Sequence, residues 1–130
     1  MYSKNLKKIT YFVNDTFDKE TGAAFVSDNI FSPAGTNIDK DRNIMLNTHG
    51  FVGYFDGFMS NPYTVSITHP ELLWGATTMD DTDLSATNDV FTMPRYAELL
   101  ENPIMYAKKN ATNFTVNGME IQIAVFSPNN

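Results

Sequence analysis

One aromatic, glycine-rich stretch organises the sequence: Leu46-Asn-Thr-His-Gly-Phe-Val-Gly-Tyr-Phe-Asp-Gly-Phe-Met59. Its three glycines permit backbone conformations and close approaches that other residues do not. Its four aromatic residues can each bury a large area. The mixture predicts a tight strand–turn or bulge within a sheet, whose aromatic side chains build the core. Asn47, His49 and Asp56 are then its polar tips.

Alternation of apolar and polar residues predicts strands on both sides of this stretch. Tyr63, Val65 and Ile67 alternate with three hydroxyl residues, the pattern of a strand with one buried face. Other extended segments are expected at Lys8–Phe17, Ala23–Val26, Ile44–Leu46 and Leu72–Met79, with loops at Asp28–Asn43 and Asp80–Asp89.

The C-terminal part carries the strongest local signals. Asn117-Gly118 joins two alternating runs, Phe114–Val116 and Met119–Val125, and favours a type I′ hairpin. One short helix is expected near residues 93–101, with Thr92 as N-cap and an end before Pro103. The fold class is therefore mainly β, an antiparallel β-sandwich or open barrel with one short helix. Residues 1–130 are expected to form a single β domain.

Composition excludes several classes of function. The net charge is −6 and the nine Lys and Arg residues form no dense stripe, so nucleic acid is not expected as a partner. No run of about 18 apolar residues is present, so no membrane span is predicted. The absence of cysteine excludes disulfides, thiolate zinc ligands and a cysteine nucleophile. The N-terminal residues lack the apolar segment of a signal peptide, and composition leaves the compartment undetermined.

The sequence assigns no metal ligand and no catalytic residue. His49 and His69 are the two histidines, and neither has a partner at ligand spacing or belongs to a His-Glu-x-x-His motif. Asp39-x-Asp41-x-Asn43 and Asp81-x-Asp83-x-Ser85 resemble the start of a calcium-binding loop, but both lack its glycine and its bidentate glutamate. Solvated acidic loops are expected at both places.

Four stretches, taken in this order, resemble one known family. They are Asn47–Gly57, the strand Asn61-Pro-Tyr-Thr-Val-Ser-Ile-Thr-His-Pro70, the segment Tyr96-Ala-Glu-Leu-Leu-Glu-Asn-Pro-Ile-Met-Tyr106, and Ile121-Gln-Ile-Ala-Val-Phe-Ser-Pro-Asn129. Together they are similar to the N-terminal, non-catalytic domain of the glycyl-aminopeptidase-like zinc metallopeptidases, metallopeptidase family sixty-one, in its Bacteroides-type members.

The resemblance implies a catalytic domain in the same polypeptide, which would handle a peptide substrate. Zinc would be bound there by His-Glu-x-x-His, where it would polarise the scissile carbonyl and lower the pKa of its water. No position of this chain matches that motif, so no cofactor and no catalytic residue are expected here. The chain is expected to be an excised or partial N-terminal domain that supports or shapes the substrate cleft. The parent is compatible with export to the periplasm or cell surface.

Two alternatives remain open from the residues. A carbohydrate- or ligand-binding module would use Phe51, Tyr54 and Phe55 as a platform, whereas a purely structural domain would bury all three. Burial of Tyr54 would make Tyr54→Ala cost a few kcal/mol. The predicted binding or domain-interface residues are Asn47, His49, Tyr54 and Asp56.

Overall fold

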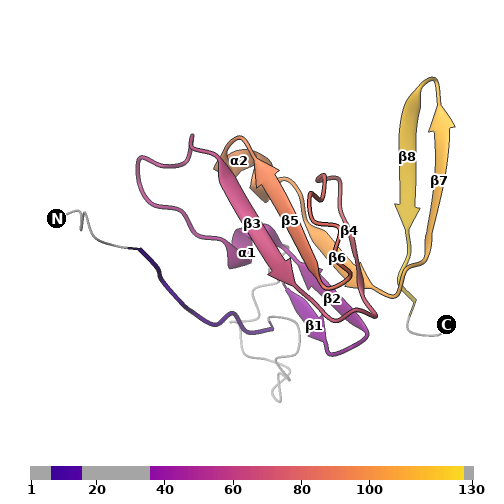
Figure 1. Cartoon of the computed structure of the whole chain (residues 1–130), viewed down its shortest axis with the longest axis horizontal. Helices are drawn as coiled ribbons and strands as arrows, with labels where there is room; N and C mark the ends of the chain where they lie inside the picture. The colour runs from indigo at the N-terminus through magenta and orange to yellow at the C-terminus, as the bar shows by residue number, and fades with distance from the viewer. Residues whose placement is uncertain (1–6, 16–35, 128–130) are drawn as a thin grey trace, which may run out of the picture.

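The computed structural model describes residues 7–15 and 36–127, and these form eight β-strands and two short helices (Figure 1). One antiparallel sheet has the order β1 (Asn37–Asp39), β2 (Asn43–Leu46), β6 (Ile104–Ala107) and β4 (Trp74–Ala76). β3 (Tyr63–Thr68) pairs with β5 (Asn88–Met93), and β7 (Ala111–Val116) pairs with β8 (Met119–Ala124). The four-stranded sheet is open, with β1 and β4 at its edges. The mainly β, antiparallel prediction is confirmed.

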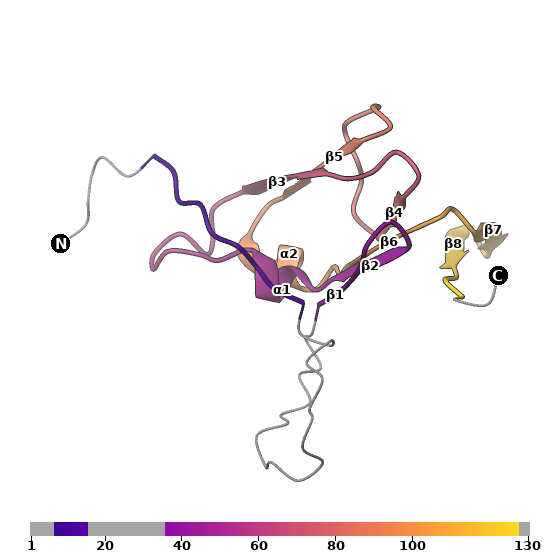
Figure 2. The ribbon, with the colours of Figure 1, turned by 90° about the horizontal axis from the view of Figure 1, so that it is seen from below.

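The core lies between the four-stranded sheet and the β3–β5 pair, which forms a separate layer (Figure 2). Helix α2 (Tyr96–Leu100) follows β5 and contributes two buried side chains to this core. The buried cluster consists of Leu46, Leu73, Met79, Phe91, Tyr96, Leu99, Ile104 and Tyr106. The two layers give the fold a sandwich-like core.

Strand β3 has the half-buried character that its alternation predicts. Tyr63, Val65 and Ile67 pack against the core cluster. The hydroxyl residues between them are exposed and bond across to β5, Thr64 to Thr92 at 3.1 Å and Ser66 to Asn88 at 2.9 Å. The apolar face therefore sets the register, while the outer face adds side-chain hydrogen bonds.

The central stretch does not form the expected strand–turn. After Leu46, the last residue of β2, and the cap residue Asn47, it forms a short helix, α1 (Thr48–Phe51), and then continues without regular structure to a turn. The buried Thr48 hydroxyl donates to the carbonyl oxygen of Leu99 at 2.7 Å, which fixes α1 on α2. This contact links residues 51 positions apart, so local periodicity could not reveal it. The expectation of a single helix is therefore wrong, because α1 is a second short helix.

The helix expected near residues 93–101 is present but shorter. Thr92 is not its N-cap, because this residue belongs to β5 and pairs with Thr64. Arg95 occupies the N-cap position without a side-chain cap, and its guanidinium instead bonds Glu98 at 2.7 Å.

Several strand predictions also change. No strand forms in the described part of Lys8–Phe17, whereas the expected loop Asp28–Asn43 contains β1. Thr16, Phe17 and Ala23–Val26 lie outside the described residues. Strands β5 and β6 were not expected. Strand β4 falls within the predicted Leu72–Met79 segment, and β2 covers the predicted Ile44–Leu46 segment but starts one residue earlier.

The C-terminal hairpin β7–β8 is confirmed. Asn117 and Gly118 have φ angles of 49° and 80°, as a type I′ turn requires. The hairpin stands beside the two layers of the core (Figure 1). Its register separates the side chains by chemistry: one face carries Thr112, Phe114, Val116, Met119, Ile121 and Ile123, and the other carries Ala111, Asn113, Thr115, Glu120, Gln122 and Ala124.

Candidate functional site

Two of the four predicted site residues lie together at the start of α1. Asn47 is the N-cap, and its side-chain oxygen accepts a hydrogen bond from the backbone N–H of His49 at 3.3 Å. Asparagine is one of the residues that most often cap the N-terminus of a helix in this way. The His49 side chain is exposed. The pair therefore marks a capped helix start on the surface.

Tyr54 and Asp56 lie further along the extended segment. The Tyr54 ring contacts the Tyr96 ring, with centroids 4.9 Å apart, yet 46% of Tyr54 is exposed. The prediction that Tyr54 is a buried core residue is therefore wrong, so the full burial on which the expected stability loss of Tyr54→Ala depended is absent. Asp56 is exposed in a turn closed by the N–H of Phe58 and the carbonyl of Phe55 at 3.0 Å. In the described residues, no hydrogen bond or ion pair joins Asn47 or His49 to Tyr54 or Asp56.

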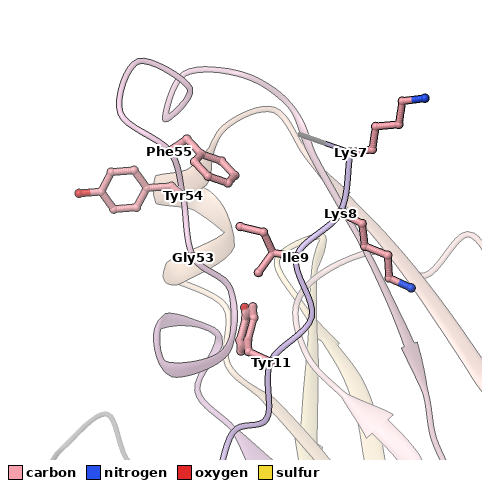
Figure 3. Close-up of a pocket in the computed structure, with 7 residues that line it drawn as sticks. All are labelled: Lys7, Lys8, Ile9, Tyr11, Gly53, Tyr54 and Phe55. Carbon is pink, nitrogen blue, oxygen red and sulfur yellow. The ribbon is translucent and has the colours of Figure 1, made fainter. Parts of the chain in front are cut away.

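A groove separates this segment from the start of the described chain, and it is called here the aromatic groove. Lys7, Lys8, Ile9 and Tyr11 form one wall, and Gly53, Tyr54 and Phe55 form the other (Figure 3). Its volume is about 430 Å³. The Tyr11 hydroxyl donates to the carbonyl oxygen of Phe51 and so joins the two walls. Phe51 is half-buried and Phe55 is exposed, so the three platform candidates are not all core residues.

A buried polar cluster joins three elements at another place. The Tyr106 hydroxyl on β6 donates to Oδ2 of Asp89 on β5 at 2.6 Å. His69, which follows β3, has its Nε2 at 3.3 Å from Oδ1 of Asp89, and its ring lies 4.8 Å from that of Tyr106. That Nε2 is buried and forms no well-aligned hydrogen bond. Gly75 on β4 leaves room for this cluster, since an added Cβ would lie 2.7 Å from Oδ2 of Asp89.

The cluster favours a neutral Tyr106. Burial is the main cause of the raised pKa of this phenol, and the neighbouring Asp89 carboxylate adds to it. A hollow of about 430 Å³ adjoins the cluster and is lined by polar and apolar residues, including Glu71, Trp74 and Gln122. The arrangement can hold a carboxylate in the interior through a hydrogen-bond donor and a nearby imidazole.

The acidic loop between β4 and β5 uses its carboxylates for its own backbone. Oδ1 of Asp81 accepts from the N–H groups of Asp83 and Val90, at 2.9 and 2.7 Å. Oδ1 of Asp83 accepts from the N–H of Ser85 at 2.8 Å, and this bond is the main cause of the lowered pKa of Asp83. Among the described residues, no group of three or more His, Asp or Glu side chains is arranged to hold a metal ion.

The apolar face of the β7–β8 hairpin is exposed. Its side chains retain much of their accessible surface: 43% for Phe114, 66% for Met119 and 50% for Ile123. The opposite face lies toward the core layers, because Glu120 and Gln122 line hollows together with Thr77 and Met79. The hairpin thus presents its polar face to the rest of the domain and its apolar face outward. We call this outward surface the apolar hairpin face.

The described residues form an antiparallel β domain with two short helices. Residues 2–108 match the Peptidase M61 N-terminal domain, and the chain belongs to this family. Comparison with curated proteins and with solved structures gives no significant match. No described helix has the length and apolar character needed to cross a membrane.

Sequence reasoning missed the buried cluster and the outward direction of the hairpin. His69, Asp89 and Tyr106 come from three elements, and no sequence spacing links them. The two-faced pattern of the hairpin, in contrast, is legible in the sequence, since Phe114, Val116, Met119, Ile121 and Ile123 fall on one face of any hairpin closed at Asn117-Gly118.

Proposed function

We propose that this chain is a non-catalytic domain of a zinc-dependent aminopeptidase, which packs on the catalytic domain and shapes its substrate cleft. Family membership supports the peptidase context. The observation that carries the packing role is the apolar hairpin face. An exposed row of large apolar side chains is characteristic of a surface that another protein element covers.

The energetics of the hairpin support this role. A two-stranded hairpin without a packed face is marginally stable in water. Here the face that could gain most from burial, with Phe114 and Ile123, is exposed. The hairpin also lies beyond the matched residues 2–108, on the C-terminal side. A catalytic domain that continues the polypeptide would cover this face and stabilise the hairpin by removing apolar area from water.

The catalytic domain supplies the chemistry in this proposal. Zinc bound there would activate water for hydrolysis of a peptide near its N-terminus. Asn47, His49, Tyr54 and Asp56 remain proposed binding or interface residues. The side chains of His49, Tyr54 and Asp56 are exposed and available for contact with a partner or substrate, whereas Asn47 is half-buried. Tyr54 would offer an aromatic surface and Asp56 a carboxylate.

The coding sequence downstream of Asn130 tests the peptidase assignment. It should encode His-Glu-x-x-His and a further glutamate within the next few hundred residues. A reading frame that lacks this motif would refute the assignment.

Paired variants in the longer polypeptide test the role of the hairpin. Phe114→Ser with Ile123→Ser should reduce release of N-terminal glycine from peptides, because the interface loses its apolar contacts. The matched pair Asn113→Ser with Gln122→Ser changes the opposite face of the same strands and should leave activity near that of the parent. Equal activity of both pairs would contradict docking through the apolar face.

A further inference from the structure

The side chains that face the aromatic groove are mainly apolar. Figure 3 shows the side chains of Ile9, Tyr11 and Phe55 gathered around it, while those of Lys7 and Lys8 point to the outer side of their wall, away from the groove. Ile9, Tyr11 and Phe55 are each more than half exposed. At Gly53, an added Cβ would meet nothing within 4 Å, so no side chain occupies the space above this residue.

Both walls also present unpaired backbone. Within the described part of the chain, neither Lys7–Tyr11 nor Gly53–Tyr54 takes part in a backbone–backbone hydrogen bond. Neither segment is helical, and neither is paired as a strand. Extended backbone with free N–H and C=O groups can pair with an added peptide strand, and neighbouring hollows can receive alternate side chains of that strand.

The charge at the groove is opposite to that of the whole chain. The net charge of the protein is −6, yet the groove is lined by two lysines and by no carboxylate. Neither lysine forms a described ion pair. A ligand with negative charge is therefore favoured at the rim by local electrostatic complementarity.

We propose that the aromatic groove binds an extended peptide in which acidic and apolar residues alternate. The peptide would pair with the free backbone of a wall, place apolar side chains against Ile9, Tyr11 and Phe55, and direct carboxylates to Lys7 and Lys8. A carbohydrate fits less well, because the lining contains no amide or carboxylate side chain to bond sugar hydroxyls. An anionic membrane fits less well too, because it offers no peptide backbone to pair with the free N–H and C=O groups of the walls.

The test uses the 130-residue chain and a fluorescein-labelled decapeptide of alternating Val and Glu, followed by fluorescence anisotropy. The control peptide has Lys in place of each Glu. We expect saturable binding of the acidic peptide, and at least about tenfold weaker binding of the basic one, since like charges at a rim suppress association. This outcome does not depend on a catalytic domain, so its failure is distinct from failure of the proposed docking.

Two sets of variants locate the site. Gly53→Leu should fill the groove without strain, because the glycine φ angle is not positive and its surroundings are open. It should weaken binding at least about tenfold by blocking the walls, while its urea unfolding midpoint remains that of the parent. Lys7→Glu with Lys8→Glu should also weaken binding, whereas Lys40→Glu with Lys108→Glu, an equal change of charge at two exposed lysines elsewhere, should not.

Three results would overturn the proposal. The first is equal affinity for the acidic and basic peptides. The second is unchanged binding by folded Gly53→Leu. The third is binding to vesicles with 30% phosphatidylserine, a proportion chosen to be roughly that of an anionic membrane surface, without binding to the acidic peptide, because it would assign the groove to a membrane.

Discussion

Removal of one hydroxyl from the core should measure how strongly the buried cluster holds the two layers together. Tyr106 has no exposed surface, and its hydroxyl is the described hydrogen-bond donor to Oδ2 of Asp89. Asp89 itself is 9% exposed, so little of its surface contacts water. Tyr106→Phe keeps the ring and its packing but leaves this carboxylate oxygen unsatisfied. Hydrogen bonds to charged groups contribute about 1.5–3 kcal/mol, and a loss of that size in the free energy of unfolding is expected.

Urea unfolding of the parent and the variant gives this difference, provided that the m-values agree. Tyr63→Phe is the matched control, because it removes a hydroxyl that bonds the carbonyl of Phe58 at 3.4 Å in an exposed setting. Its cost should be within about 0.5 kcal/mol, as for other surface substitutions. Equal stability of Tyr106→Phe and the parent would refute the view that this bond satisfies a buried carboxylate.

Three further outcomes follow from the cluster and the surfaces. The pKa of Tyr106 is raised in the folded state, so its contribution to stability is complete below about pH 10, the ordinary pKa of tyrosine, and falls as pH rises above that value. The urea midpoint should therefore drop more for the parent than for Tyr106→Phe between pH 8 and pH 11. Parallel curves for the two proteins would contradict this. Gly75→Ala should destabilise by about 1–3 kcal/mol, since its Cβ would lie 2.7 Å from Oδ2 of Asp89 and overpacking costs that much; Gly53→Ala, which meets nothing within 4 Å, should be close to neutral in the same assay. The 130-residue chain should release no N-terminal glycine from peptides with or without added zinc, and zinc-dependent release by the purified chain would show that the catalytic residues have been missed.

The parts that the sequence predicted well depend on short-range chemistry. Asn117-Gly118 specifies a turn with positive φ at both residues, so the hairpin could be predicted from a few neighbouring positions. The alternation at Tyr63–Thr68 likewise reflects one buried and one exposed face of a single strand. Helix α2 was expected, although its start lies later because β5 extends through Thr92 and Met93 to complete its pairing with β3.

The parts that failed depend on distant contacts. Helix α1 forms where the sequence favoured a strand–turn, and its Thr48 is held by Leu99 of α2. Tyr54 and Phe55 were expected in the core because they are large aromatic residues. The buried aromatic residues of the core cluster include Tyr96 and Tyr106, whereas Tyr54 and Phe55 lie on the surface. Among the predicted site residues, the capping role of Asn47 is explained by local chemistry. The groove beside Tyr54 needs the distant segment Lys7–Tyr11, so it could not be predicted.

Hydrogen exchange at the hairpin tests the central claim most directly, namely that this domain docks on a catalytic domain through its apolar hairpin face. Amide exchange of residues 111–124 should be fast in the 130-residue chain, because a hairpin whose apolar face is exposed opens locally at low cost. In the longer polypeptide, the same amides should exchange at least about 100-fold more slowly, as expected when local opening must also break a packed interface. Equal exchange rates in the two proteins would contradict the claim.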